Sequence, residues 1–227
     1  MDIKVVAFDA DDTLWHNESY FQEMEERFAV LLEDYLPQHT VARELLKTEE
    51  HNVGMYGYGI KSFILSMVET AIRVTDKTAR LEIIERILGL GKEMLNKPVD
   101  LLDGVEEVLG ALRVKYRLVM ATKGDLLDQE RKLLKSGLEE YFHHIEIMSE
   151  KKEPNYQRLI SHLDIKPGEF AIVGNSLKSD IMPVLNLGGH GFHVPYHLHW
   201  TFDKIDVKVE HTNFTRLEKI TDAMGLL

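Results

Sequence analysis

Three aspartates follow the first apolar segment of the sequence. Residues 3–8 read IKVVAF, and Asp9, Asp11 and Asp12 come directly after them. Two carboxylates one residue apart at the end of a strand can point into one crevice, the first as a ligand or nucleophile and the second as a proton donor. Because two like charges so close together need a cation or a proton, the spacing predicts a site that binds positive charge. Taken alone, such a cluster is also typical of a solvated turn or helix cap.

Polar residues also follow three later apolar segments. They are Thr122 with Lys123, then Lys151, then Asn175 with Asp180 a turn later. In an open parallel sheet, ligands bind beyond the carboxyl ends of the strands, so we expect these side chains to converge on the aspartates. Mg²⁺ prefers oxygen ligands and is typically held by one or two carboxylates together with substrate phosphate. A hydroxyl at Thr122 and an ammonium at Lys151 would bind phosphate oxygens.

These residue types indicate phosphoryl transfer through a covalent intermediate. Asp9 would attack phosphorus to form an aspartyl-phosphate, a known use of a carboxylate nucleophile. Asp11 would protonate the leaving alkoxide and then deprotonate the water that hydrolyses the intermediate. Mg²⁺ and Lys151 would neutralise charge on the transferred group, and Asp180 would complete the metal site.

The rest of the sequence must position these residues, and it shows two kinds of pattern. Residues 16–97 show helical periodicity and almost no strand signal, which predicts a helical bundle. Its apolar stripes lie at residues 21–35, 63–72 and 83–88. Glycines and tyrosines at 55–63 indicate either a turn that reads the substrate or a plain interhelical turn.

From residue 98 the pattern alternates helices with short apolar strands, as a parallel α/β sheet requires. The expected strands are residues 117–121, 145–148, 170–173 and a last one near 191–194, and the expected helices are 105–115, 126–136, 155–163 and 177–187. Residues 1–15 supply one more strand. The expected fold class is therefore α/β, with a Rossmann-like parallel core of residues 1–15 and 98–227 and an inserted helical domain of residues 16–97.

The composition limits the classes of partner. A formal net charge of -11 argues against nucleic-acid binding, since phosphate neutralisation needs clustered Lys and Arg. The sequence has no apolar run of the roughly 18 residues that a membrane span needs. The start MDIKVVAF does not resemble a secretory signal, and the chain contains no cysteine, so we expect a cytoplasmic location. The expected partner is a small metabolite, and a homodimer is left open.

Four ordered segments resemble the motifs of the haloacid dehalogenase (HAD) superfamily. They are DADDT at 9–13, VMATKGD at 119–125, SEKKEPNY at 149–156 and VGNSLKSDI at 173–181. Their order, spacing and strand-end placement match across essentially the whole expected core, and the helical insert resembles the cap of the helical-cap (C1) group. The resemblance implies a Mg²⁺-dependent phosphohydrolase that acts on a small phosphorylated metabolite and closes a cap over it.

The resemblance also implies a role for each matching residue. Asp9 corresponds to the nucleophile and Asp11 to the acid/base, whose backbone oxygen also ligates magnesium in the family. Thr122 corresponds to the phosphate-binding hydroxyl, Lys151 to the lysine of the third motif, and Asp180 to the last acidic residue of the metal site.

Two further assignments concern lysines. Lys151 is preferred to Lys152 because its three-residue step to Pro154 resembles the K-x-x-P of the family. Lys123, next to Thr122, is a second candidate for contact with phosphate.

Two positions depart from the family pattern. Asp12 stands where many members have Gly, a change that is tolerable because Asp is among the few residues that adopt left-handed backbone conformations. Asn175 stands where many members have a metal-ligating Asp. Its amide oxygen can still ligate a metal, but one negative charge is lost, which predicts weaker Mg²⁺ binding.

Three alternatives to a phosphohydrolase are a 2-haloacid dehalogenase, a phosphomutase and a catalytically weak HAD-like binding protein. A dehalogenase needs neither an acid for a phosphate leaving group nor magnesium, so Asp11 and Asp180 argue against it. A phosphomutase requires the cap to retain a phosphorylated intermediate. If the protein is a catalytically weak binding protein, the replacement of the usual metal-ligating Asp by Asn175 would be the change that accounts for its weak activity.

Overall fold

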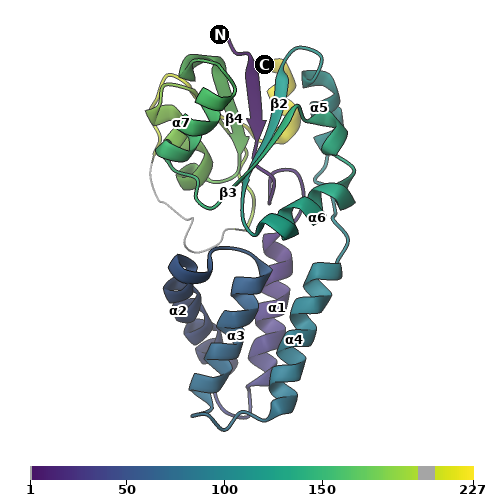
Figure 1. The fold of residues 1–227 in the computed structure, drawn as a ribbon, viewed down its shortest axis with the longest axis vertical. Helices are drawn as coiled ribbons and strands as arrows, with labels where there is room; N and C mark the ends of the chain where they lie inside the picture. Colours follow the sequence, from purple (N-terminus) through teal and green to yellow (C-terminus); the bar gives the residue numbers. More distant parts are fainter. Residues whose placement is uncertain (1, 199–207) are drawn as a thin grey trace. The chain divides into compact units, whose positions relative to one another are not determined.

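A computed structural model describes residues 2–198 and 208–227 of the chain. The chain divides into two compact units, which Figure 1 draws as a sheet with its helices and a set of long helices. One, here called the core unit, comprises Met1–Glu18, Val99–Lys123 and Gln129–Leu227. The other, here called the helical unit, comprises Ser19–Pro98 and Gly124–Asp128.

The core unit contains a parallel sheet of six strands in the order β3-β2-β1-β4-β5-β6. The strands are β1 (Val5–Phe8), β2 (Arg117–Lys123), β3 (His144–Met148), β4 (Phe170–Gly174), β5 (His190–His193) and β6 (Phe214–Arg216). Val5 of β1 pairs with Arg117 of β2 on one side and with Phe170 of β4 on the other. The strand order changes direction at β1, so this strand marks the topological switch point where such sheets bind ligands. The predicted α/β class is confirmed.

Helices cover both faces of the sheet. They are α5 (Val105–Leu112), α6 (Leu126–Ser136), α7 (Glu153–His162) and α8 (Met182–Asn186). On β1, Val6 and Phe8 belong to a buried cluster that includes α5, whereas Val5 and Ala7 belong to a second cluster that includes α7. Figure 1 shows α5 and α7 on opposite sides of the sheet. Because both faces are covered, β1 is apolar at every position.

Four helices of the helical unit share one buried apolar core. They are α1 (Glu18–Leu31), α2 (Gln38–Tyr56), α3 (Ile60–Val74) and α4 (Leu81–Asn96). Phe28 of α1, Met67 of α3 and Ile87 of α4 are fully buried in it. At Gly91 of α4 a Cβ would lie 1.9 Å from Cδ1 of Ile64, so the Ile64 side chain of α3 occupies the space that a larger residue at this position would need.

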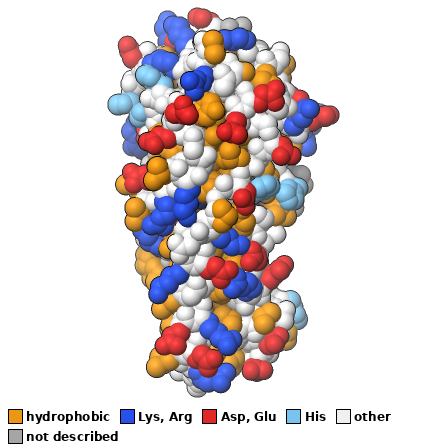
Figure 2. Space-filling model, turned by 90° about the vertical axis from the view of Figure 1, so that its right-hand side faces the viewer, with side chains coloured by type: hydrophobic (Ala, Val, Ile, Leu, Met, Phe, Trp, Pro, Cys, Tyr) orange, Lys and Arg blue, Asp and Glu red, His pale blue; other side chains and the backbone are white. Residues whose placement is uncertain are grey.

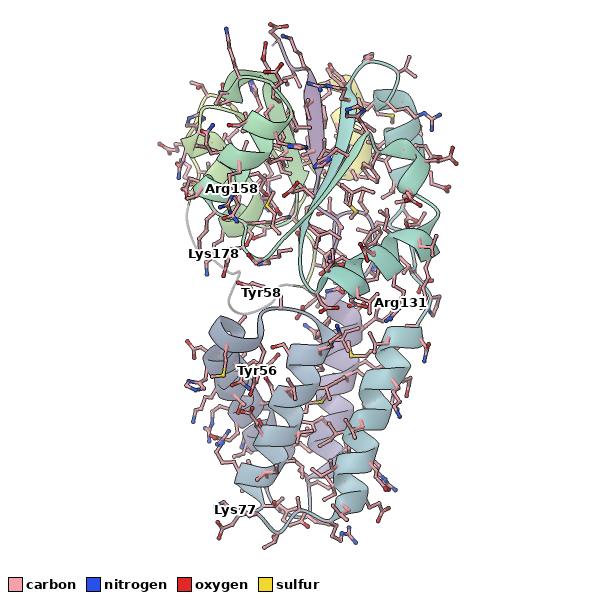
Figure 3. All side chains as sticks on the ribbon, in the orientation of Figure 1. Tyr56, Tyr58, Lys77, Arg131, Arg158 and Lys178 are labelled. Carbon is pink, nitrogen blue, oxygen red and sulfur yellow. The ribbon has the colours of Figure 1, made fainter. Side chains whose placement is uncertain are left out.

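Part of the contact between α2 and α3 is polar. Asn52 Nδ2 donates a hydrogen bond to Glu69 Oε2 at 3.1 Å, and Thr70 Oγ1 donates to Thr48 Oγ1 at 2.8 Å. Tyr56, which Figure 3 labels on α2, donates its hydroxyl hydrogen to Glu69 Oε1 at 3.0 Å. Each buried polar group in this set has a partner, which avoids the penalty of an unpaired buried group.

The structure differs from the sequence-based expectation in some bounds, since α5 ends at Leu112 and β2 extends to Lys123, and it differs more substantially at three elements. The helix α2 was not predicted, because its buried face is half polar, with Thr48 and Asn52 beside Val41 and Leu45. The strand expected near 191–194 is β5, but it is not the last strand, since β6 follows it. The single helix expected at 177–187 is instead a π-helical turn at Leu177–Ile181 followed by the short helix α8.

The chain leaves the core unit and returns to it at adjacent positions. Trp15 forms an antiparallel bridge with Leu101, and the backbone N–H of His16 donates to the carbonyl oxygen of Asp100 at 3.0 Å. The core unit therefore holds both ends of the insert side by side.

Acidic and basic side chains are interspersed over the face that Figure 2 draws. Among the helices in the described part of the chain, none combines the length and the apolar character that a membrane crossing requires.

Candidate active site

Asp9 lies directly beyond the carboxyl end of β1, at the switch point of the sheet. Its backbone N–H donates to the carbonyl oxygen of Val173 in β4 at 2.9 Å, so the strand pairing fixes its backbone. The residue is only 6% exposed. Burial, and then the negative charge of Asp180, raise the pKa of the Asp9 carboxyl to about 7, although Lys151 opposes this shift.

The ammonium group of Lys151 bridges two carboxylates. Its Nζ donates to Oδ1 of Asp9 and to Oδ1 of Asp180, the second at 2.6 Å. The Lys151 side chain is 1% exposed. Burial lowers its pKa, but the charges of Asp180 and Asp9 outweigh that effect and hold the pKa well above its ordinary value. Two buried carboxylates therefore face one fixed positive charge.

The neighbouring lysine occupies a different environment. The Lys152 side chain is 67% exposed, and its Nζ lies 3.7 Å from Oε2 of Glu150. The two lysines follow β3 and immediately precede α7, which begins at Glu153 with Pro154 in its first turn. At this point the chain turns one lysine inward and the next outward, so the structure brings Lys151, and not Lys152, to Asp9.

Asp180 reaches the site from a tight turn after β4. The segment Leu177–Ile181 is π-helical, a local form that occurs mostly as single turns, frequently at functional sites. Asp180 Oδ2 accepts a hydrogen bond from the backbone N–H of Ser176 at 2.9 Å, and the residue is 1% exposed. Lys178 of the same turn is exposed, and Figure 3 labels it at the outside of the core unit.

Thr13 links Asp9 to Asn175. Its hydroxyl oxygen accepts from the backbone N–H of Asn175 at 3.1 Å and lies 3.1 Å from Asp9 Oδ2, to which it donates. The Asn175 side-chain oxygen is 3.5 Å from the same hydroxyl. Asn175 therefore lies beside the Asp9 carboxylate, as its position after β4 predicts.

Asp11 and Thr122 are joined by side chains of α6. Oδ1 of Asp11 accepts from Trp15 Nε1 at 2.7 Å and from Lys132 Nζ at 2.6 Å. Oδ2 of Asp11 accepts from Gln129 Nε2 at 3.1 Å, and the same nitrogen donates to Thr122 Oγ1 at 2.7 Å. The two candidate residues are thus connected through one amide.

Lys123 lies next to the turn that carries Asp180. Its Nζ donates to Oγ of Ser179 at 3.0 Å. The candidate residues therefore lie at or just beyond the carboxyl ends of β1, β2, β3 and β4. Their side chains form three hydrogen-bonded groups: Asp9 with Lys151, Asp180, Thr13 and Asn175; Asp11 with Gln129 and Thr122; and Lys123 with Ser179.

Asp12 shapes the turn after β1. Its φ of 61° lies in the left-handed region, as its place in a position that often holds Gly predicts. Its carboxylate accepts from the backbone N–H groups of Asn17 and Glu18 at 2.9 to 3.1 Å, at the start of α1. Burial raises the pKa of Asp12 to about 7, while these two backbone donors act in the opposite direction.

Three residues of this set were missing from the sequence-based candidates. Thr13 stands inside the DADDT motif, and its spacing of four residues from Asp9 is the signal that could have identified it. Gln129 and Lys132 lie three residues apart on α6, hence on the same face of the helix. A polar pair at that spacing, directly after the motif at 119–125, was the available signal for them.

The oxygen atoms around Asp9 suit a hard cation. In residues 2–198 and 208–227 no three Asp, Glu, His or Cys side chains are grouped as a metal site. The set is instead two carboxylates, Asp9 and Asp180, and the amide oxygen of Asn175. Mg²⁺ is usually bound by one or two carboxylates and keeps several waters, so this donor set fits Mg²⁺.

The chain belongs to the haloacid dehalogenase-like hydrolase family, which it matches over residues 3–188. The four-motif resemblance is thereby confirmed. A haloacid dehalogenase-like family hydrolase from Xanthomonas campestris is 36% identical, with a TM-score of 0.89 over 99% of this chain and 90% of that chain.

Two curated relatives carry the name of a phosphatase. The N-acylneuraminate-9-phosphatase of Mus musculus is 31% identical over 126 residues, which are 53% of this chain and 51% of that protein. The N-acylneuraminate-9-phosphatase of Homo sapiens is 29% identical over the same shares. The chain spans about half the length of the curated relatives that it matches.

Structures of lower identity share the fold alone. The HAD phosphatase from Thermococcus onnurineus is 18% identical, with a TM-score of 0.67 over 99% of this chain and 97% of that chain. The L-2-haloacid dehalogenase from Xanthobacter autotrophicus is 15% identical, with a TM-score of 0.56 over 85% of this chain and 77% of that chain. The fold thus accompanies more than one reaction among these proteins, and the reaction must be argued from the site.

Proposed function

We propose that the protein is a Mg²⁺-dependent phosphohydrolase that cleaves a small phosphate monoester through an aspartyl-phosphate intermediate. The observation that carries this proposal is the Asp9 carboxylate, buried at the switch point and held beside Lys151 and Asp180. A carboxylate nucleophile needs a fixed orientation and a positive environment for the group that it attacks. The phosphatase names of the curated relatives support the same class of reaction.

The proposed reaction has two steps. In the first step a carboxylate oxygen of Asp9 forms a bond to phosphorus, the bond from phosphorus to the ester oxygen breaks, and Asp11 gives a proton to the leaving alkoxide. In the second step Asp11 takes a proton from water, the water oxygen bonds to phosphorus, and the bond to Asp9 breaks. Inorganic phosphate and the original Asp9 carboxylate result.

The other residues of the site bind the phosphoryl group. Lys151 supplies positive charge next to the nucleophile, where charge builds up on the phosphoryl oxygens. Thr122 and Lys123, at the end of β2, supply a hydroxyl and an ammonium as hydrogen-bond donors. Lys152 is left out of the site by its exposure.

The metal ligands would be the carboxylates of Asp9 and Asp180, the amide oxygen of Asn175 and the backbone oxygen of Asp11. When bound there, Mg²⁺ supplies positive charge to the phosphoryl group. Lys151 supplies a positive charge to both of the carboxylates that it contacts.

The helical unit is proposed to act as a cap that keeps bulk water from the site during the first step. The substrate is proposed to be a small phosphorylated metabolite. The names of the curated relatives place N-acylneuraminate 9-phosphate in the panel of esters to be tested.

Phosphate release from p-nitrophenyl phosphate and from this panel tests the proposal. We expect turnover by the wild type with Mg²⁺, loss of turnover with EDTA, and a loss of about a thousandfold or more in Asp9→Asn, because covalent catalysis requires that carboxylate. Lys151→Met should likewise lose turnover, and Lys152→Met is the matched control that should retain it. Undiminished turnover in Asp9→Asn, or halide release from a 2-haloacid in place of phosphate release, would overturn the proposal.

A further inference from the structure

The carboxyl group of Asp11 is held by donors on two elements. Trp15 Nε1, on the turn after β1, is 2.7 Å from Oδ1. Lys132 Nζ is 2.6 Å from the same oxygen, and Gln129 Nε2 is 3.1 Å from Oδ2. Since both oxygens have a donor, the contacts fix the rotation of the carboxyl group as well as its position.

Gln129 is a buried side chain that hydrogen-bonds to two candidate site residues. It is 2% exposed, and its amide nitrogen donates to Asp11 and, at 2.7 Å, to Thr122 Oγ1. A hydroxyl oxygen that accepts this bond has its own hydrogen directed away from Gln129. Gln129 therefore sets the orientation of both the acid and the proposed phosphate-binding hydroxyl.

Lys132 holds the other oxygen of Asp11. Its side chain is 17% exposed, and its Nζ also donates to Asn17 Oδ1 at 3.1 Å. Gln129 and Lys132 belong to the part of α6 that lies in the core unit. The helix that follows β2 thus presents two donors to Asp11 from one face.

We infer that Gln129 and Lys132 are positioning residues that hold Asp11 where it can protonate the leaving group, and that Gln129 also orients Thr122. The inference rests on the proposed function, because it concerns the first step of that reaction. Proton transfer requires the acid within hydrogen-bonding reach of the ester oxygen, and a displacement of about 1 Å can cost about a hundredfold in rate.

The test compares two leaving groups. A simple alkyl phosphate releases a strongly basic alkoxide that needs the proton of Asp11 in the first step, whereas p-nitrophenyl phosphate releases a stable phenolate that does not. The parameter kcat/KM reports the first irreversible step, which in the proposed reaction is phosphoryl transfer to Asp9. The ratio of kcat/KM for the two esters, measured on one preparation, does not depend on the fraction of folded enzyme.

The variants are Lys132→Met, which removes the ammonium group and keeps most of the unbranched stem, and Gln129→Met, which keeps the length of the side chain and removes its amide. We expect kcat/KM for the alkyl ester to fall at least about tenfold relative to p-nitrophenyl phosphate, since general acid catalysis contributes about 10²–10⁴-fold. Lys132→Arg should recover part of the loss because it restores a cationic donor. Gln129→Met should in addition weaken inhibition by inorganic phosphate, because Thr122 loses its orienting partner.

Lys135→Met is the matched control, since Lys135 is an exposed lysine on the same helix, and it should leave the ratio unchanged. A wild-type ratio in both Lys132→Met and Gln129→Met would overturn the inference while leaving the phosphohydrolase proposal standing. A wild type that hydrolyses neither ester would overturn the proposed function and this inference with it.

Discussion

Gly174 lies so close to Asp180 that a Cβ at Gly174 would stand 2.5 Å from Oδ2 and 2.6 Å from Cγ of the aspartate. Gly174 ends β4, and its missing side chain is what allows the π-helical turn to fold Asp180 back over the strand. The contact between Asp180 and Lys151 therefore depends on a glycine whose backbone is otherwise ordinary strand.

Gly174→Ala should displace Asp180 from Lys151. We expect a loss of about 1–3 kcal/mol in the free energy of unfolding from overpacking, and a higher Mg²⁺ concentration for half-maximal activity. Urea unfolding and a Mg²⁺ activation curve measure the two effects. The control is Gly110→Ala in α5, where the nearest atom would be 4.0 Å away, and where the change should stabilise the helix by about 0.5–1 kcal/mol. Equal half-saturation in the wild type and Gly174→Ala would contradict the prediction.

Thr13→Val should remove the link between Asp9 and Asn175 while keeping the shape of the side chain. The backbone N–H of Asn175 then lacks its acceptor, which costs about 1–3 kcal/mol of stability, and Asp9 loses the hydrogen bond to Oδ2. We expect kcat to fall more than KM rises, because the nucleophile loses its orientation. Thr13→Ser restores the hydroxyl and should recover most of kcat. If Thr13→Ser does not recover kcat, the hydroxyl group of Thr13 is not what orients Asp9.

Asn175→Asp should strengthen Mg²⁺ binding. The change adds a negative charge beside Asp9, and the affinity of such sites rises with the charge of the ligand set. We expect the half-saturating Mg²⁺ concentration to fall by about tenfold, which corresponds to about 1.4 kcal/mol. A Mg²⁺ titration of phosphatase activity in both proteins measures it, and identical curves would refute the expectation.

Glu44→Gln should change how the stability of the helical unit depends on pH. Hydrogen bonds from Lys47 and Arg73 lower the pKa of Glu44 from 4.5 to about 2. A carboxyl whose pKa is lower in the folded state stabilises the protein above its unfolded pKa, and this contribution is lost as the pH falls toward the folded pKa. The stability difference between wild type and variant should therefore shrink between pH 7 and pH 3 in urea unfolding. Glu85→Gln, at an exposed position of α4, is the control, and a difference that does not change with pH would contradict the expectation.

The positions of Asp9, Thr122, Lys151 and Asn175 could be predicted because each lies at the carboxyl end of an apolar strand or in the loop after it. Parallel strands bring their carboxyl ends to one edge of a sheet, so the identity of the strands was sufficient to place these residues together. The choice of Lys151 over Lys152 depended on one spacing, and the burial of the first and exposure of the second agree with it.

The contacts of Asp11 could not be predicted in the same way. They come from Gln129 and Lys132 of α6. Other polar residues of this helix face solvent, and the sequence alone does not say which polar residues turn toward the sheet. The helix α2 was also not predicted from the sequence. Thr48 and Asn52 occupy buried positions of this helix, where the search for a hydrophobic stripe expects apolar residues.

The pairing of β1 affects the order in which the parts of the protein can fold during synthesis. Val5 pairs with Arg117 and Phe170, so on the ribosome the first strand emerges long before either neighbour. The contiguous segment Ser19–Pro98, which supplies most of the helical unit, is complete earlier and has local contacts of its own, which form faster than distant ones. Both edges of β1 can be paired only after β4 has been synthesised, so Asp9 is made before the helical segment and is enclosed after that segment can fold.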